Sequence, residues 1–151
     1  MNSLVRHATQ EDLSTIADFN VAMALETENK VLDATTVLKG AGNLLSHPEL
    51  GFYLVAESEG ELAACLMVTF EWSDWRNGFF WWIQSVYVAP QHRCKGLYRK
   101  MYGRVKQLAK EKANICGLRL YVEKQNVHAQ TTYQTLGMCE TDYLLFEEVL
   151  K

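Results

Sequence analysis

The chain has 151 residues, of which 48% are hydrophobic and 22% are charged, and its net charge is −3. These values are typical of one globular domain, so we expect a single domain over residues 1–151. The first twenty residues lack the apolar core of a secretory signal, and no uncharged stretch is long enough to cross a bilayer. We therefore predict a cytoplasmic protein with no membrane partner.

The first quarter of the chain predicts one strand and two helices. Residues Ser3–Ala8 favour a short strand. Thr9 and Asp12 have the spacing of a helix-capping pair, and apolar residues follow at helical spacing. Asp33 is a second candidate N-cap and precedes another amphipathic stretch that ends near residue 45.

The middle of the chain predicts three consecutive antiparallel strands. Two turn signals separate the segments, Ser58-Glu59-Gly60 and Asn77-Gly78, and the second is the strongest hairpin signal in the sequence. The segments rich in β-forming residues are Phe52–Ala56, Leu62–Glu71 and Phe79–Val88.

The last third predicts a return to alternating helices and strands. The expected elements are a helix on Leu97–Ala109, a strand at Leu118–Glu123, a short helix capped by Asn126 and ended by Gly137, and strand-like residues over Met138–Val149. The order indicates an α/β layered fold, antiparallel in its first half and with one crossover helix in its second.

Positive charge is concentrated in one segment of an otherwise acidic chain. Residues 91–112 contain eight Lys or Arg and one acid, whereas residues 1–90 contain four Lys or Arg and twelve acids. The turn before the Leu97–Ala109 helix holds Arg93, Lys95 and one glycine, Gly96. Cations normally complement the end of a helix, so cations at its start indicate that an anion joins them there. The acidic first part argues against nucleic acid as that anion.

The turn fits neither of two common phosphate-binding patterns. It lacks the G-x-x-x-x-G-K-[ST] pattern of a P-loop and the G-x-G-x-x-G pattern of a dinucleotide site. The segment Arg93-Cys94-Lys95-Gly96-Leu97-Tyr98 instead resembles the pyrophosphate-binding segment of the GNAT superfamily of acyl-CoA-dependent N-acyltransferases. Ser85–Pro90 resembles the fourth strand of that family, and Leu120-Tyr121-Val122, Asn126, Ala129, Tyr133 and Gly137-Met138 resemble its later signature.

The resemblance implies a mixed sheet whose fourth and fifth strands are parallel and splayed, with helices on both faces. It implies acetyl-CoA as the acyl donor. The main chains of Val86 and Val88 would bind the pantetheine arm, and the residues that would hold the pyrophosphate are Arg93, Cys94, Lys95, Gly96, Leu97 and Tyr98. Asn126 would approach the pantetheine, and Tyr133 would be the general acid for the leaving thiolate. A plain helix cap at Asn126 and a core aromatic at Tyr133 are the alternatives.

Two positions depart from the family pattern. Tyr98 stands where a Gly or Ala is usual, so its side chain is expected to turn away from the ligand. Many relatives carry a glutamate as general base on the fourth strand, but the matching residue here is Gln84, which cannot accept a proton. The base must therefore lie elsewhere or act through water, unless the amine arrives neutral.

An acidic, aromatic-lined site would attract a protonated amine by charge and by cation–π contact. Two segments supply such residues, Glu26-Thr27-Glu28 and Glu71-Trp72-Ser73-Asp74-Trp75. We expect the acceptor to contact residues of the set Glu26, Glu28, Glu71, Trp72, Asp74 and Gln84. A solvated helix end is the alternative for the first segment, and a core position is the alternative for Trp81 or Trp82 beside the second.

These observations predict an acetyl-CoA-dependent N-acetyltransferase that acts on a small cationic amine by direct transfer in a ternary complex. A protein lysine or N-terminal acetyltransferase is the second possibility within this chemistry. A non-catalytic acyl-CoA-binding regulator is the alternative from another class, since Gln84 replaces the usual base. We expect no metal, because the four cysteines have no ligand spacing. A homodimer is left open.

Overall fold

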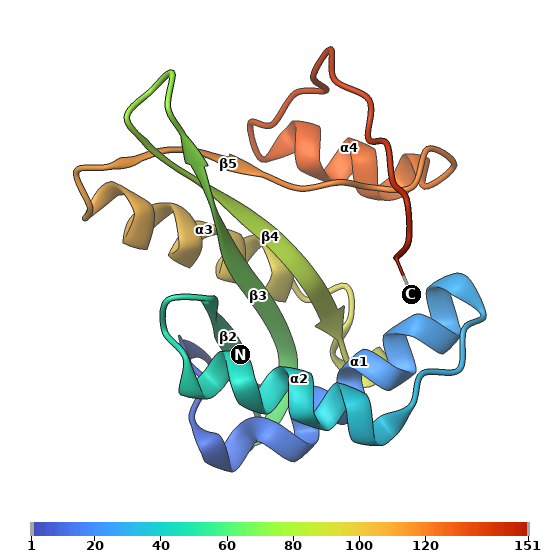
Figure 1. Ribbon diagram of the computed structural model, residues 1–151. Helices are drawn as coiled ribbons and strands as arrows, with labels where there is room; N and C mark the ends of the chain where they lie inside the picture. Colours follow the sequence, from blue (N-terminus) through green and yellow to red (C-terminus); the bar gives the residue numbers. More distant parts are fainter. Residues whose placement is uncertain (1, 151) are drawn as a thin grey trace. The chain divides into compact units, whose positions relative to one another are not determined.

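The computed structural model describes residues 2–150, and the chain divides into two compact units with their boundary between Leu120 and Tyr121. The first unit contains a five-stranded sheet with the order β1-β2-β3-β4-β5 (Figure 1). Its strands are β1 (Ser3–His7), β2 (Gly51–Ser58), β3 (Glu61–Ser73), β4 (Gly78–Val88) and β5 (Ile115–Arg119). Neighbours β1 to β4 pair antiparallel and β5 joins β4 in parallel, as the sequence predicted.

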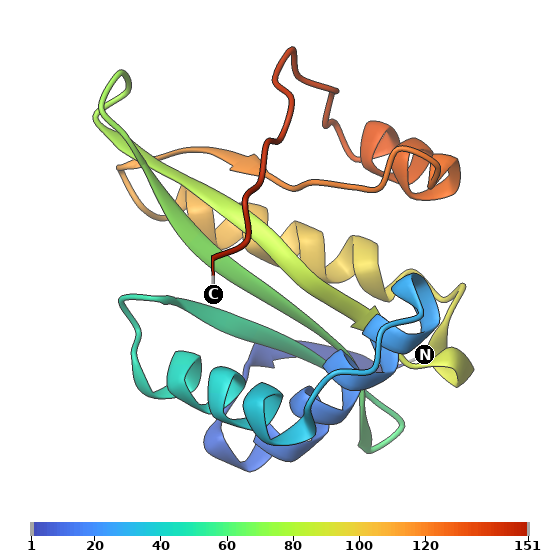
Figure 2. The same ribbon diagram turned by 45° about the vertical axis from the view of Figure 1, so that its right-hand side comes forward.

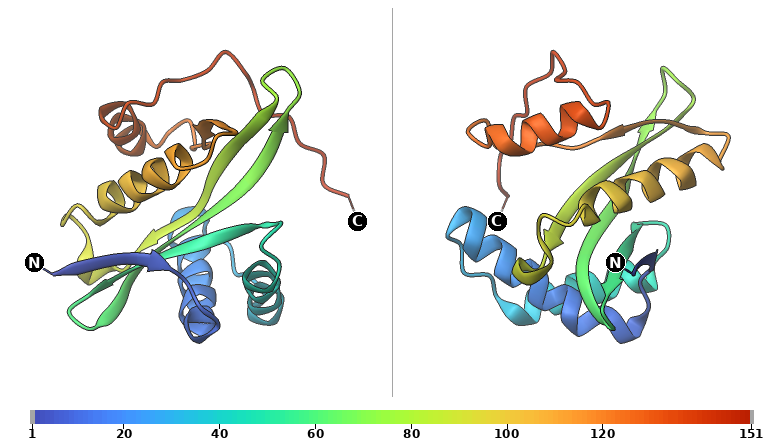
Figure 3. Two further views of the ribbon diagram at one scale, coloured as in Figure 1. Left: turned by 90° about the vertical axis from the view of Figure 1, so that its left-hand side faces the viewer. Right: turned by 180° about the vertical axis from the view of Figure 1, so that it is seen from behind.

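Helices cover both faces of this sheet. The 3-10 turn η1 (Gln10–Asp12) leads into α1 (Leu13–Glu28) and α2 (Ala34–Ser46), which lie on one face, and α3 (Leu97–Lys110) lies on the other (Figures 2 and 3). Asp33 caps α2, because its Oδ2 accepts a hydrogen bond from the Thr36 amide at 3.0 Å. The predicted helices are therefore present, with the caps that the sequence indicated.

Successive side chains of a strand point to opposite faces of the sheet, so the core has two layers. Tyr53, Val55 and Cys65 point to α1 and α2, where they meet Ile16 and Leu44. The strand residues between these positions face α3. The buried residues of this second layer are Leu54, Leu66 and Val68 from the strands and Leu97, Met101 and Val105 from α3. The sheet is therefore packed on both faces, and β4 lies between the central strand β3 and the edge strand β5.

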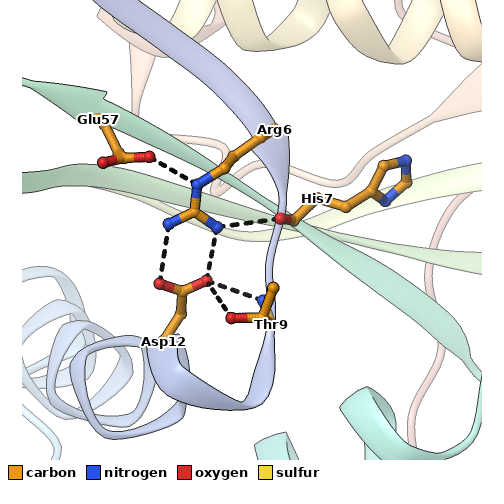
Figure 4. A network of polar contacts seen from close by, with 5 residues as sticks. All are labelled: Arg6, His7, Thr9, Asp12 and Glu57. Atoms are coloured by element: carbon orange, nitrogen blue, oxygen red, sulfur yellow. Dashed lines mark hydrogen bonds and ion pairs between the residues drawn. The ribbon is translucent and has the colours of Figure 1, made fainter.

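One arginine joins the first strand to the second and to the turn that starts α1 (Figure 4). Both terminal nitrogens of Arg6 bind the Asp12 carboxylate, at 2.8 and 3.1 Å, and its Nε donates to Glu57 at 2.6 Å. Asp12 also accepts the Thr9 amide at 2.8 Å, which completes the predicted capping pair. Asp12 is 6% exposed, so its charge is stabilised by these bonds rather than by water.

The second unit contains the helix α4 (Val127–Thr135). Asn126 caps it, because its Oδ1 accepts the Ala129 amide at 3.1 Å. Gly137 ends it with φ +100°, and the Met138 amide donates back to the Tyr133 carbonyl at 3.0 Å. Both helix boundaries agree with the sequence prediction.

Two predicted strands are corrected. The strand expected at Leu118–Glu123 is Ile115–Arg119, because pairing with β4 starts at Phe79–Ile115 and Gly117 lies within the strand rather than before it. The segment Met138–Val149 was expected to be strand-like, but no strand is assigned there among the described residues. Strand preference depends on a neighbouring strand, and the second unit offers none among its described residues.

Replacing Asp12 by Asn should lower the free energy of unfolding by about 2 kcal/mol at pH 7, because it removes a charged, nearly buried partner of Arg6. Arg6 holds the pKa of Asp12 below its usual range. The carboxylate therefore contributes stability above its unfolded pKa of about 3.9, and the contribution disappears as the pH falls through the lower folded value.

Urea unfolding from pH 7 to pH 3 measures this difference. The gap between the wild type and Asp12→Asn should narrow below about pH 4. The neighbouring exposed residue provides a control, Glu11→Gln, which should have little effect. Equal losses in both variants would contradict the role assigned to the Arg6 network.

Candidate active site

The site begins where β4 and β5 diverge. Their parallel pairing covers Phe79–Trp82 on β4 and ends at Arg119 on β5. β4 continues to Val88 without a β5 partner, while β3 still pairs with its other edge. One edge of residues 83–88 is therefore not used by β5, which is the splayed arrangement that the sequence resemblance implied.

A bulge turns the main chain of β4 within this stretch. Cys65 pairs with Tyr87 and Met67 pairs with Gln84. The two β4 residues Ser85 and Val86 therefore lie opposite one β3 residue, Leu66, which is the pattern of a β-bulge. Ser85 has φ +51°, a conformation that a non-glycine residue adopts rarely. The bulge changes the direction of the peptide groups around Val86, and Val86 and Val88 are both half-buried.

The cationic turn follows β4 directly. It comprises the 3-10 turn η2 (Pro90–His92) and residues 93–96, and α3 then begins at Leu97. Cys94 and Gly96 have φ of +61° and +76°, and left-handed residues of this kind make concavities of main-chain N–H groups. The first turn of α3 adds N–H groups that have no partner within the helix, and it adds a positive dipole end.

Backbone conformation explains the glycine at position 96, and a ring contact accompanies the tyrosine at position 98. A Cβ on Gly96 would meet no atom within 4 Å, so the left-handed backbone rather than space favours glycine there. The Tyr98 ring lies 6.2 Å from that of Tyr102, one helical turn further along α3. The two rings therefore lie next to each other on the surface of the helix, and the expectation that Tyr98 turns away from a ligand stays a prediction.

The structure brings together two residues that the sequence assigned to different ligands. Arg93 forms a two-pronged ion pair with Glu26 at the end of α1, with N–O distances of 2.6 and 3.0 Å. The hydrogen bonds to Arg93 lower the pKa of Glu26, which keeps it ionised. Arg93 Nε also donates to the Val88 carbonyl at 2.8 Å. Glu28 lies nearby in sequence but pairs with Lys30 at 3.2 Å on the exposed end of α1.

A second polar cluster lies on the sheet at the point of divergence. Glu71 Oε1 accepts the Trp82 Nε1 hydrogen at 2.9 Å and an Arg119 hydrogen at 2.8 Å, and these bonds lower its pKa. The Arg119 guanidinium lies 3.6 Å from the centre of the Phe80 ring. Sequence reasoning gave Arg119 no role, because nothing in the linear pattern places it beside a residue 48 positions earlier.

Gln84 belongs to the same face of the sheet as Glu71. Its Nε2 donates to the Thr69 hydroxyl at 2.7 Å. Thr69 and Glu71 are two residues apart on β3, so their side chains lie on the same face of the sheet. Trp72 takes the opposite face, where its ring meets Phe79 at 5.0 Å. Asp74 is exposed in the β3–β4 turn. The structure thus places Glu71 and Gln84 on one face and does not place Trp72 with them.

The remaining predicted residues, Asn126 and Tyr133, belong to the second unit. The Asn126 side chain forms the helix cap already described. Tyr133 lies in α4, and burial raises the pKa of its phenol. The phenol therefore keeps its proton throughout the neutral and mildly alkaline range.

Comparisons with known proteins identify the family. Residues 4–138 match the model of the acetyltransferase (GNAT) family, so the chain belongs to that family. A search of the curated proteins returned no match.

Solved structures agree with this assignment. A "possible acetyltransferase" from Clostridium difficile 630 is 43% identical, with a TM-score of 0.93, over 100% of this chain and 99% of that one. A predicted acetyltransferase from Clostridium acetobutylicum, solved with acetyl-CoA, is 21% identical with a TM-score of 0.78, over 97% and 96% of the two chains. Glucosamine-6-phosphate N-acetyltransferase from Arabidopsis thaliana is 17% identical with a TM-score of 0.73, over 98% and 99%.

Two further properties follow from the described residues alone. No helix within residues 2–150 has both the length and the apolar character that a membrane crossing requires. No group of three or more His, Cys, Asp or Glu side chains in the same range is arranged to hold a metal ion.

Replacing Gly117 by Ala should disturb the point of divergence. The added Cβ would lie 2.6 Å from the Phe80 ring, on which Arg119 stacks. We expect a loss of about 1–3 kcal/mol in the free energy of unfolding, as for other overpacked sites.

Gly103→Ala is a matched control. Gly103 lies in α3, and a Cβ added there would have no atom within 4 Å, so alanine should stabilise the helix by about 0.5–1 kcal/mol. Urea unfolding of both variants tests the contrast. Changes of the same sign and size would show that Gly117 is not constrained by Phe80.

Proposed function

We propose that this protein is an acetyl-CoA-dependent N-acetyltransferase that acetylates a primary amine of a small cationic acceptor in a ternary complex. The observation that carries the proposal is the stretch of β4 from residue 83 to 88, which has one edge not used by β5 and runs straight into the cationic turn. Membership of the GNAT acetyltransferase family supports it.

The residues of the first unit fit the chemistry of coenzyme A. Acetyl-CoA supplies the acetyl group as a thioester. The main chains of Val86 and Val88 would bind its pantetheine amides, since β5 does not pair with that part of β4 and the bulge redirects its peptide groups. The N–H groups and cations of the turn would bind the diphosphate. The residues proposed for that role are Arg93, Cys94, Lys95, Gly96, Leu97 and Tyr98.

For the acceptor we propose the face of the sheet that carries Gln84, together with carboxylates near its two ends, Glu71 and Glu26. Both carboxylates have lowered pKa values, Glu26 because Arg93 binds it and Glu71 because Trp82 and, to a lesser degree, Arg119 donate hydrogen bonds to it. A carboxylate of low pKa attracts an ammonium group but removes its proton poorly. We therefore assign these groups to binding and orientation. Glu28, Trp72 and Asp74 would contribute at most to the outer surface of the acceptor site.

The transfer requires one bond to form and one to break. The neutral amine nitrogen attacks the thioester carbonyl, the carbon–sulfur bond breaks, and the amide nitrogen loses its extra proton. Tyr133 would donate its phenolic proton to the leaving thiolate, which is reasonable because its raised pKa keeps it protonated. Asn126 would contact the pantetheine with the part of its amide not used for the cap. Since Gln84 donates to Thr69 and cannot act as a base, water would accept the proton of the amine.

A non-catalytic acyl-CoA-binding protein is the second candidate. The observation in its favour is Gln84, an amide at the position where many relatives carry a basic carboxylate. A protein acetyltransferase is the remaining alternative within the same chemistry.

The proposal predicts acetyl-CoA-dependent thiol release with a small amine. A panel of polyamines, amino sugars, amino acids and short lysine peptides should give turnover with at least one small cationic amine. Because no strong base is assigned, kcat/KM should rise about tenfold per pH unit below the pKa of the amine, in proportion to its neutral fraction. Turnover confined to peptides would favour the protein acetyltransferase. Acetyl-CoA binding without turnover across the panel would favour the binding protein.

Tyr133→Phe should lower kcat about 100-fold while the affinity for acetyl-CoA is retained, because only the acidic proton is lost. Steady-state kinetics and calorimetric titration measure the two quantities. Tyr143→Phe is the control, since Tyr143 belongs to the same unit and is 72% exposed. Full activity of Tyr133→Phe would remove the proposed acid.

A further inference from the structure

The side chain of Arg93 lies where the cofactor is proposed to bind. Its Nε donates to the Val88 carbonyl at 2.8 Å, and its two terminal nitrogens hold Glu26 at 2.6 and 3.0 Å. Its guanidinium also lies 5.4 Å from the centre of the Tyr87 ring. Arg93 thus joins the end of β4, the cationic turn and the end of α1.

A guanidinium has two edges that can each bind a pair of oxygen atoms, and these contacts use donors on both edges. A guanidinium presents five N–H donors in a rigid planar fork, and it binds carboxylates and phosphates with two donors at a time. Glu26 takes the end formed by the two terminal nitrogens, and the Val88 carbonyl takes the side at Nε. A diphosphate oxygen pair can reach neither edge until one of these partners leaves.

Val88 is engaged in the same way. Its carbonyl is one of the main-chain groups proposed for the pantetheine, and Arg93 already donates to it. While these bonds last, the Val88 carbonyl is not free for the pantetheine, and the Arg93 guanidinium is not free for the diphosphate. Glu26, in turn, is ionised but paired with Arg93, so its charge attracts an ammonium group less strongly.

We propose that Arg93 is a latch, bound to Glu26 and the Val88 carbonyl before acetyl-CoA arrives, and that the diphosphate exchanges for these partners and so frees Glu26 to bind the acceptor amine. The inference rests on the proposed function, because it assigns the order of events at the same site. It makes Glu26 a residue that opposes cofactor binding and favours acceptor binding.

The latch predicts an unusual sign for one substitution. Glu26→Gln should tighten acetyl-CoA binding about three- to fivefold, because the variant no longer competes with the diphosphate for Arg93 and an exposed ion pair is worth a factor of this size. The same variant should raise the KM for the amine. Calorimetric titration of acetyl-CoA into the full-length protein at about 20 mM salt measures the first effect, since salt screens exposed pairs.

Two controls separate the latch from a general electrostatic effect. Asp18→Asn removes one negative charge from the exposed side of α1 and should leave the acetyl-CoA affinity unchanged. In an Arg93→Ala background, Glu26→Gln should have no further effect on that affinity. A gain that persists without Arg93, or that Asp18→Asn reproduces, would overturn the latch.

The remaining outcomes are also decisive. Weaker or unchanged binding in Glu26→Gln would overturn the latch while wild-type binding of acetyl-CoA leaves the proposed function intact. Absence of acetyl-CoA binding by the wild type would instead refute the proposed function itself.

Discussion

The site depends on one constraint of the sheet, the early end of the β4–β5 pairing. β5 follows β4 only as far as Trp82, and beyond that point β4 has a bulge at Ser85 and, among the described strands, pairs only with β3. Main-chain polar groups must find partners when they are buried, so we propose that this edge of β4 binds an amide-rich ligand. In the same proposal, the cationic turn and the start of α3 would extend that surface to the diphosphate end of such a ligand.

Two arginine–carboxylate pairs lie near the ends of this open stretch. Arg119 binds Glu71 where the strands part, and Arg93 binds Glu26 where β4 ends. Both carboxylates come from the acidic first part of the chain, and both arginines come from later segments. Hydrogen bonds lower the pKa of both carboxylates, from Arg93 to Glu26 and from Trp82 and Arg119 to Glu71, so neither carboxylate is a strong base. The charge asymmetry read from the sequence thus becomes a set of specific contacts.

Much of the fold could be predicted from local signals. Asn77-Gly78, the caps at Asp33 and Asn126, and the glycine at 137 each act within a few residues, so their effects are readable from the sequence. The strands expected at 118–123 and 138–149 were wrong, because strand formation depends on a partner elsewhere in the chain. The alternation of Glu71 and Trp72 was readable, but grouping them in one site neglected that neighbours on a strand face opposite ways.

The cationic turn was predicted as a unit because its residues are contiguous. The pairing of Arg93 with Glu26 spans 67 positions, and that of Arg119 with Glu71 spans 48, so no local pattern could indicate either. Sequence reasoning therefore predicted a cofactor-binding segment and candidate carboxylates, but not the contacts that these residues make with each other. Tertiary packing decides which charges meet, and it also decides whether a carboxylate acts as a base.

Hydrogen–deuterium exchange with and without acetyl-CoA tests the central claim most directly. If the open edge of β4 and the cationic turn bind the cofactor, peptides covering residues 83–88 and 93–99 should exchange more slowly in its presence. A peptide covering α2, Ala34–Ser46, should be unaffected. Protection confined to other segments, with no change at residues 83–88 and 93–99, would contradict the account.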